Sequence, residues 1–277
     1  MRLFVDNLTN VDFSYLCPAR GMVGETWLAH IELVGGLDEQ GMVCDFGVVK
    51  KKLRHWLDTE IDHRLLVPTL HTGCQVTAGG RVAVDFPLHN QTNIKTAGPA
   101  QAITLVPVAA ITPSSVARWC ETQLKDTFGS AVSSVQLRFT NEAIDTPFYH
   151  YSHGLKKHGG NCQRIAHGHR SKLLIWKNGT PDDALIEEWT DQFHDIYLGT
   201  RDDICAQDEH YIHFSYTAQQ GDFTLSMPKA ACYLMDTDTT VELIAEHIAS
   251  KLKAQYPSDS FTVKAFEGIG KGAIASA

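Results

Sequence analysis

The chain has 277 residues, enough for one large domain or two of ordinary size, and either can bury a sizeable core. Its apolar fraction of 43% and charged fraction of 20% are those of a folded, soluble protein and exclude a disordered one. A formal net charge of -8 argues against a nucleic-acid partner, because no basic stripe is available to contact a phosphate backbone.

The cysteines and the N-terminus indicate the compartment. Seven cysteines are scattered without a CxxC pair, which predicts reduced thiols rather than a disulfide framework. The N-terminal sequence MRLFVDNLTN has no long apolar run, so we expect neither a signal peptide nor a membrane anchor. We therefore predict a cytoplasmic protein without membrane contacts.

The first half of the chain predicts an α+β unit that begins with two strands. In GMVCDFGVVKKKLRHWL, Asp45 is a plausible N-cap before apolar residues at helical spacing. The stretches CQVTAGGRVAVDF and AITLVPVAAI then predict a hairpin and a further strand. A second helix is expected to open on Thr112 and Pro113, and the alternating run SSVQLRF closes the unit as a strand.

The second half repeats this order of elements. TPDDALIEEWTDQF predicts a helix opened by Thr180 and Pro181, and YIHFSYTAQQGDFTLSM with AACYLMD predicts a hairpin and a strand. A helix starting near Thr239 and the strand SFTVKAF follow. We therefore predict two α+β units, residues 1–147 and 148–277, which meet near Pro147; chance similarity of the two patterns is the alternative.

The segment YHYSHGLKKHGGNCQRIAHGHRSKLLIW contains a candidate metal site. His167 and His169 alternate across Gly168, so on a strand both side chains point to the same face, and His153 on the preceding strand can supply a third nitrogen. Three histidines with an open fourth position are typical of catalytic Zn²⁺. The alternative is a set of surface histidines in a polar loop.

A cysteine and several cations accompany these histidines. Cys162 lies in a Gly-Gly-Asn-Cys loop, where nearby cations and a metal favour its thiolate, so it is a candidate base or nucleophile. A small buried hydrophobic role is the alternative. Arg164, Arg170 and Lys172 help to make this the most positive stretch of the chain, which suits either a phosphorylated substrate or a merely solvated face.

At these residues the sequence resembles the 6-pyruvoyl-tetrahydropterin synthase and 6-carboxytetrahydropterin synthase family, which carries a first histidine, a cysteine and then His-Gly-His. The resemblance implies the tunnelling fold (T-fold), in which units with an antiparallel four-stranded sheet and two helices assemble into a barrel. It therefore implies a homo-oligomer with active sites at unit interfaces. It also implies Zn²⁺ as cofactor.

The resemblance assigns roles to individual residues of the second half. His153, His167 and His169 correspond to the zinc ligands, and Cys162 to the base that abstracts a proton. Glu267, in FTVKAFEG, stands where a glutamate anchors the pterin ring; a surface glutamate at a strand end is the alternative. Further candidates for substrate contacts are Thr240, Arg164 and Lys172.

The first half resembles the same family without its metal ligands. In VDFSYLCPARGMVGETWLAHIEL, the positions of the three histidines are taken by Tyr15, Val23 and Glu25. That half is not expected to bind zinc in this way.

The acid/base pair of the family, unlike its metal ligands, has its match in the first half of the chain. Asp62 and His63, in IDHRLL, match the family's Asp-His partners of the cysteine, whereas the second half offers only the reversed pair His194 and Asp195. We therefore expect a composite active site, with Asp62 and His63 supplied by a first unit of the same or another chain. A helix-terminal turn residue and a packing histidine are the alternative roles.

The resemblance implies a zinc-dependent lyase that acts on 7,8-dihydroneopterin triphosphate and releases triphosphate. The favoured product is 6-carboxy-5,6,7,8-tetrahydropterin, as in queuosine-type deazapurine biosynthesis, and the other is the 6-pyruvoyl compound. Two alternatives stay open: an aldolase-type lyase acting on unphosphorylated dihydroneopterin, and a non-catalytic pterin-binding scaffold.

Overall fold

A computed structural model describes residues 1–129 and 132–277 of the chain. The helices are α1 (Phe46–Glu60), α2 (Pro113–Leu124), α3 (Asp183–Gln192) and α4 (Val241–Gln255). The strands of the first half are β1 (Arg2–Cys17), β2 (Gly21–Gly35), β3 (Leu65–Pro68), β4 (Gln75–Thr77), β5 (Arg81–Pro87), β6 (Asn93–Pro99), β7 (Ile103–Val106) and β8 (Val132–Thr140).

The second half contains the remaining strands and most of the short 3-10 turns. Its strands are β9 (Phe148–His153), β10 (His167–Lys177), β11 (Thr180–Pro181), β12 (Ile196–Thr200), β13 (Ile204–Gln207), β14 (Tyr211–Ala218), β15 (Gly221–Pro228), β16 (Cys232–Met235), β17 (Phe261–Phe266) and β18 (Gly272–Ser276). The 3-10 turns of the chain are η1 (Ala100–Ala102), η2 (Asn161–Gln163), η3 (Arg201–Asp203) and η4 (Lys229–Ala231).

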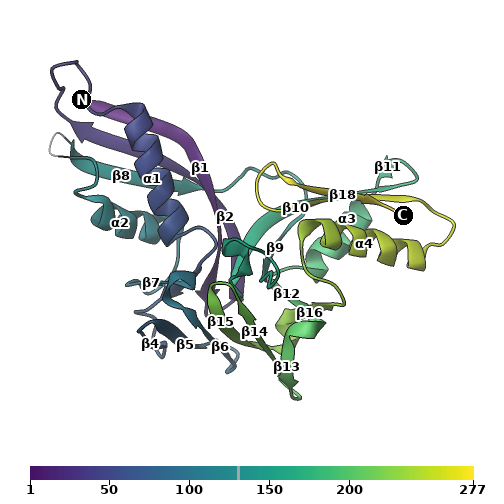
Figure 1. Ribbon diagram of the computed structural model, residues 1–277. Coiled ribbons are helices and arrows are strands. Elements are labelled where there is room, and N and C mark those ends of the chain that lie inside the picture. Colours follow the sequence, from purple (N-terminus) through teal and green to yellow (C-terminus); the bar gives the residue numbers. More distant parts are fainter. Residues whose placement is uncertain (130–131) are drawn as a thin grey trace.

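Each half builds one main sheet covered by its two helices (Figure 1). The first sheet has the order β7-β3-β1-β2-β8, in which β1, β2 and β8 are antiparallel and β3 and β7 run parallel to β1. Apolar residues of α1 and α2, such as Leu53 and Cys120, pack with Trp27 and Phe13 in its core. Removing this apolar surface from water stabilises the unit.

The second half has the matching arrangement, with the order β16-β12-β9-β10-β17-β18 and β11 paired to β10. Strands β12 and β16 again run parallel to β9, and α3 and α4 cover the sheet through residues such as Trp189 and Ile248. Two α+β units are therefore present, as predicted. Each main sheet adds parallel strands to the antiparallel ones that the sequence predicts, and the predicted boundary near Pro147 falls between β8 and β9.

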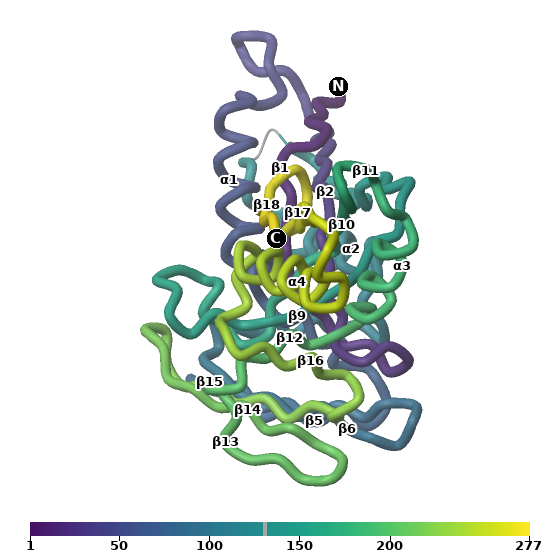
Figure 2. Tube along the Cα trace, turned by 90° about the vertical axis from the view of Figure 1, so that its right-hand side faces the viewer, coloured from purple at the N-terminus to yellow at the C-terminus, as the bar shows by residue number. Residues whose placement is uncertain are grey.

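A third sheet joins the two units. Its order is β13-β14-β15-β6-β5-β4, and β15 pairs antiparallel with β6 through Thr224 with Ala97 and Ser226 with Lys95. Figure 2 shows its strands together at one end of the molecule, away from α1 and β11. Because hairpins from both halves share one hydrogen-bonded sheet with its own apolar core, the two units are held together within one chain.

The hairpins β1-β2 and β9-β10 also pack directly against each other. The hydroxyl oxygens of Ser14 and Ser152 lie 2.7 Å apart. A Cβ atom on Gly168 would lie 2.7 Å from the Cα atom of Gly24, so these positions require glycine for the close approach of the two backbones. Residues far apart in the sequence therefore meet at this junction.

The helix starts follow the predictions at three of the four helices. Asp45 caps α1, accepting hydrogen bonds from two backbone N–H groups, and Thr112 caps α2 in a capping box. Helix α4 begins at Val241, close to the predicted start. The prediction for α3 was wrong, because Asp182 is its N-cap and residues 180–181 form β11 instead.

Among the described residues, no helix is long and apolar enough to cross a membrane.

Candidate active site

Three buried histidines of the second unit converge on one point. In the β9-β10 ladder His167 lies opposite His153, and His169 lies two residues further on β10, so all three side chains share one face. None of the three is exposed to solvent. One ring nitrogen from each lies within 4.8 Å of the others, which is the spacing that a single bound metal ion requires.

The other nitrogen of each ring faces an oxygen atom. The Nδ1 atom of His153 lies 2.9 Å from the carbonyl oxygen of Thr239, and that of His167 lies 3.0 Å from the carbonyl oxygen of Arg164. Since a carbonyl only accepts, both Nδ1 atoms carry the proton. The Nδ1 atom of His169 lies 3.3 Å from Oδ1 of Asp12.

The Nε2 atoms of the three histidines are buried and have no hydrogen-bond partner, and the same holds for Nδ1 of His169, whose approach to Asp12 lacks hydrogen-bond geometry. Burial lowers the pKa of His153 and of His167 well below the ordinary value, so both rings are neutral and can act as ligands. Buried polar atoms without partners are costly, and a metal ion would satisfy all three at once. The donor set of three imidazoles therefore fits a divalent cation such as Zn²⁺.

Asp62 and His63, from the first unit, lie against this cluster. They follow the end of α1, where His63 has a positive φ of 55°, and Nδ1 of His63 lies 2.6 Å from Oδ2 of Asp62. The rings of His63 and His167 have centroids 5.0 Å apart. The acid/base pair of one unit and the histidines of the other therefore meet within a single chain.

Cys162 completes this group. It lies in η2, and its Sγ atom and the ring nitrogens of His63 and His167 are within 4.8 Å of one another. Burial opposes a charge on His63, but the hydrogen bonds with Asp62 and Cys162 outweigh it and raise the pKa of His63 to about 10. The imidazole of His63 is therefore held as a cation beside Cys162.

Asp12, on β1, is a site residue that the sequence analysis missed. It is 1% exposed, and its Oδ1 accepts a hydrogen bond of 2.6 Å from the hydroxyl of Thr26. Burial acts against ionisation, but His169, Lys271 and Thr26 together hold the pKa of Asp12 well below its ordinary range. The available signal was a carboxylate within an otherwise buried strand, VDFSYL.

Thr239 is a second site residue that the sequence analysis missed, because it named the neighbouring Thr240 instead. Its carbonyl oxygen faces His153, whereas the hydroxyl of Thr240 caps α4 by accepting from the backbone N–H of Leu243. The structure thus places Thr240 at the start of a helix whose preceding residue orients a histidine.

The remaining predicted substrate contacts lie in different surroundings. Glu267 follows β17, and its Oε1 lies 3.6 Å from Nε2 of His169, so it borders the cluster. Arg164 is buried and donates to the carbonyl oxygens of Asp62 and His63.

Lys172 is not brought to the cluster. Because side chains alternate along β10, it points to the opposite face from His167 and His169, and its Nζ pairs with Glu142 at 3.1 Å.

The equivalent place in the first unit has no metal ligands. Tyr15 lies opposite Val23 in the β1-β2 ladder, as His153 lies opposite His167, and Glu25 occupies the position of His169. Oε1 of Glu25 accepts hydrogen bonds from the backbone of Thr26 and from Asn141. Burial raises the pKa of Glu25 to about 7.

The reversed pair of the second unit lies at that same junction. Asp195 also has a positive φ, 53°, and its carboxylate accepts two hydrogen bonds from Arg20, of 2.6 and 2.7 Å. Arg20 also donates to the hydroxyl of Tyr15. His194 and Asp195 therefore do not replace Asp62 and His63 beside the histidine cluster.

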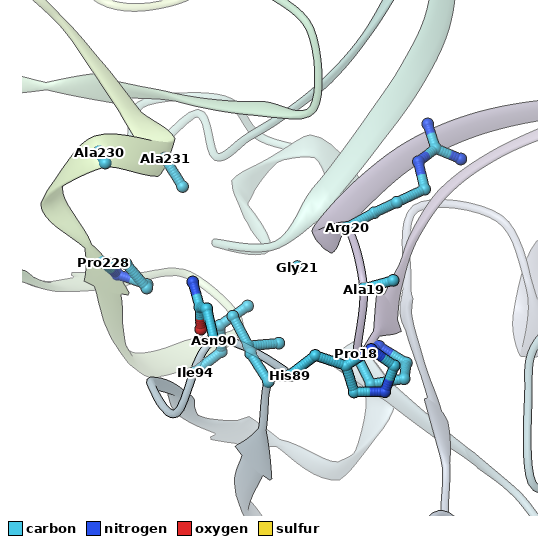
Figure 3. A pocket seen from close by; sticks show the side chains of 11 residues that line it. Pro18, Ala19, Arg20, Gly21, His89, Asn90, Ile94, Pro228, Ala230 and Ala231 are labelled. Atoms are coloured by element: carbon cyan, nitrogen blue, oxygen red, sulfur yellow. The ribbon is translucent and has the colours of Figure 1, made fainter.

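A hollow of about 330 Å³ lies beside the β1-β2 turn. Figure 3 shows Pro18, Ala19 and Arg20 on one side of it and Pro228 with Ala231 on the other. The turn between β1 and β2 spans only residues 18–20, whereas the segment 154–166 that joins β9 to β10 in the second unit is much longer and carries Cys162. None of the residues that line this hollow belongs to the histidine cluster.

Two repeated α+β units that build one histidine-rich site at their junction define a tandem T-fold protein. The family model for 6-pyruvoyl tetrahydropterin synthase matches residues 17–146 and again residues 144–276. The chain therefore belongs to the 6-pyruvoyl tetrahydropterin synthase family, and the expected fold class and enzyme class, a lyase of this family, are confirmed.

Several solved structures are similar to parts of this chain. A 6-pyruvoyltetrahydropterin synthase from Plasmodium vivax, with a catalytic residue mutated, is 14% identical, with a TM-score of 0.42 over 50% of this chain and 90% of that one. Another structure of the Plasmodium vivax enzyme is also 14% identical, with a TM-score of 0.42 over 53% and 93%. The Plasmodium falciparum enzyme is 13% identical, with a TM-score of 0.37 over 46% and 78%. No curated protein matches the chain significantly.

Proposed function

We propose that the protein is a zinc-dependent lyase that converts 7,8-dihydroneopterin triphosphate to 6-carboxy-5,6,7,8-tetrahydropterin with release of triphosphate. The observation that carries this proposal is the meeting of Asp62 and His63 from the first unit with Cys162 and the histidine cluster of the second. Each unit alone lacks part of the family's catalytic set. Together they supply all of it in one chain.

His153, His167 and His169 would hold the metal through their unpartnered Nε2 atoms. When bound, Zn²⁺ supplies a Lewis acid that polarises an oxygen of the substrate side chain. The buried setting of the three rings excludes water and makes such an electrostatic contribution larger than it is in solution.

Proton transfer is assigned to Cys162 and His63. Cys162, whose Sγ atom lies within 4.8 Å of the ring nitrogens of His63 and His167, takes a proton from a substrate carbon. Asp62 accepts the Nδ1 proton of His63 and fixes the ring, so Nε2 is the atom that delivers a proton to the substrate or receives one. In these roles, Asp62 of the first unit orients His63, and Cys162 of the second unit abstracts the proton from the substrate.

Recognition of the pterin ring is assigned to Glu267. A carboxylate can accept paired hydrogen bonds from the ring amino and N–H groups, and Glu267 borders the cluster at 3.6 Å from His169. The buried Arg164 is already engaged with backbone carbonyls, so its role in this proposal is to hold the Asp62–His63 turn. Thr240 remains a predicted contact, and Lys172 is left out because it faces away.

Assembly and context remain part of the proposal. A homo-oligomer in which units line a barrel agrees with the family's general arrangement, although this chain already forms one interface between units internally. A cytoplasmic location and a role in queuosine-type deazapurine synthesis stay predictions from the sequence.

The direct test is to incubate zinc-loaded protein with 7,8-dihydroneopterin triphosphate and to identify the pterin by mass while triphosphate is measured. Release of triphosphate with the 6-carboxy product supports the proposal, and the 6-pyruvoyl product would correct its last step. Turnover of unphosphorylated dihydroneopterin alone would replace it with an aldolase. Absence of both zinc and turnover would indicate a pterin-binding scaffold.

A further inference from the structure

The three histidines of the cluster are oriented in two different ways. His153 and His167 donate to backbone carbonyl oxygens of their own unit. His169 instead faces the carboxylate of Asp12, which comes from the other unit and lies 3.3 Å from its Nδ1. One predicted metal ligand therefore faces a charged group of the unit that has no metal ligands of its own, at ion-pair distance and without the geometry of a hydrogen bond.

The carboxylate of Asp12 is itself tightly held. Oδ1 accepts a hydrogen bond of 2.6 Å from Thr26, and Oδ2 lies 3.2 Å from Nζ of Lys271 and 3.4 Å from Nδ2 of Asn10. With 1% of the residue exposed, little water competes for these contacts. The oxygen that faces His169 is thus fixed before any metal binds.

The backbone of the same residue holds the acid/base pair. The N–H of Asp12 donates to Oδ1 of Asp62 at 2.8 Å, and the carbonyl oxygen of Asp12 accepts from the N–H of His63 at 2.6 Å. The side chain of Asp12 therefore reaches the histidine cluster, while its backbone fixes Asp62 and His63. Arg164 links the same two parts from the second unit, because its guanidinium donates to the carbonyl oxygens of Asp62 and His63 and its own carbonyl oxygen accepts from His167.

We propose that Asp12 is a positioning residue through which the first unit sets the metal affinity of the second. It fixes His169 with Nδ1 protonated and Nε2 directed to the metal, and its charge makes that nitrogen a stronger donor. Partners of this kind typically change metal affinity by roughly 10- to 100-fold. The inference rests on the proposed function only in taking the histidine cluster as the metal site.

The first test is the variant Asp12→Asn, which keeps the size of the side chain and the backbone contacts but removes the charge. Zinc affinity of the full chain is measured by competition with a chromophoric chelator, without substrate. We expect binding roughly 10- to 100-fold weaker than in the wild type. The absorption bands of the Co²⁺-loaded variant should also shift, because the donor strength of His169 changes, which a purely structural role would not produce.

The matched control is Asp195→Asn at the equivalent junction. This carboxylate is also largely buried and pairs with Arg20, but it has no contact with the histidine cluster, so zinc affinity should stay at the wild-type value. Equal weakening in both variants would mean a general loss of packing and would overturn the proposal.

If Asp12→Asn does not fold, Thr26→Val decides the question. It removes the 2.6 Å hydrogen bond that holds Oδ1 of Asp12 and the 3.2 Å hydrogen bond that Thr26 accepts from the backbone N–H of Arg170, with little change in volume, and should weaken zinc binding several-fold. Wild-type zinc affinity in either variant that folds contradicts the inference. Wild-type protein that binds zinc but turns over no pterin would instead contradict the proposed function and leave this inference standing.

Discussion

The hairpins β1-β2 and β9-β10 occupy equivalent places in the two units but carry different chemistry. The second hairpin presents three buried histidines, whereas the first presents Tyr15, Val23 and Glu25 at the matching ladder positions. The turns that face the two hairpins also differ, because Asp62–His63 lies against the histidines of β9-β10, whereas Asp195 lies beside β1-β2 and forms an ion pair with Arg20. One junction therefore holds the groups of the proposed active site, and the other is a structural contact.

The first unit can therefore lack the metal ligands, and the second the acid/base pair, without loss of the combined set. A site built between two units needs the metal ligands from only one of them and the acid/base pair from only the other. Once both units are in one chain, the losses in each copy are compensated by what the other retains. The first unit still acts on the site through Asp62, His63 and Asp12.

The largest effect is expected from removing a predicted metal ligand. His167→Ala takes away one of the three unpartnered Nε2 atoms and the ring next to His63, so both bound zinc and turnover should be lost. Metal analysis of the purified protein and the product assay measure this. Tyr15→Phe, at the place of His153 in the other hairpin, should keep one zinc per chain; equal zinc loss in both variants would remove the distinction between the hairpins.

Removing the acid/base pair should lower turnover without changing metal binding. His63→Ala should lower kcat by roughly 10²- to 10⁴-fold, the usual contribution of a general acid or base, and leave the zinc content intact. Steady-state kinetics and metal analysis on the same preparation test both halves of this statement. His194→Ala, in the reversed pair, should retain wild-type kcat. Full activity of His63→Ala would show that the composite site is wrong.

The stability of the protein should depend on pH through Glu25, which lies in the hairpin β1-β2. Burial raises its pKa from the ordinary 4.5 to about 7, so between these values the folded state binds more protons than the unfolded state. Stability due to this group is therefore present below pH 4.5 and is lost as the pH rises through 7. Glu25→Gln keeps an acceptor for Thr26 and Asn141 but has no proton to lose, so it should stabilise the protein by about 2 to 3 kcal/mol at pH 8.

Urea unfolding at pH 8 and at pH 5 measures this effect, and the gain should shrink at the lower pH. Glu32→Gln is the control, because its carboxylate is half-exposed and pairs with the exposed Arg2, so its effect should be small at both pH values. A gain for Glu25→Gln that does not change with pH would contradict a buried, protonated carboxyl at this junction.

Local patterns were enough to predict much of the molecule. Alternation across Gly168 correctly put His167 and His169 on one face, and Asp45 and Thr112 cap the helices that they were expected to cap. The same alternation puts Lys172 on the opposite face, and it could have excluded this residue. Arguing from charge alone led to its selection.

What local patterns could not predict depends on contacts between the units. The packing of Ser14 on Ser152, and of Gly24 on Gly168, joins residues far apart in the chain. Asp12 acquires its role only from that packing, so a local pattern shows it merely as a carboxylate in a strand. Strand β6 (Asn93–Pro99) was not predicted either, since its sequence NIKTAGP has little β propensity and it is stabilised by pairing with β15.

The smallest predicted effect concerns α3, the helix whose start the sequence analysis placed too early. In the first unit Asp45 caps α1, and in the second Asp182 caps α3 by accepting from the backbone N–H of Leu185 at 3.1 Å. Asp182→Ala should therefore lower the free energy of unfolding by about 1 kcal/mol. Thr180→Ala should change it by only a few tenths, because Thr180 lies in β11 outside the helix. Urea unfolding of both variants measures the two changes. A larger loss of stability for Thr180→Ala than for Asp182→Ala would indicate that the helix begins at Thr180, as the sequence pattern predicted.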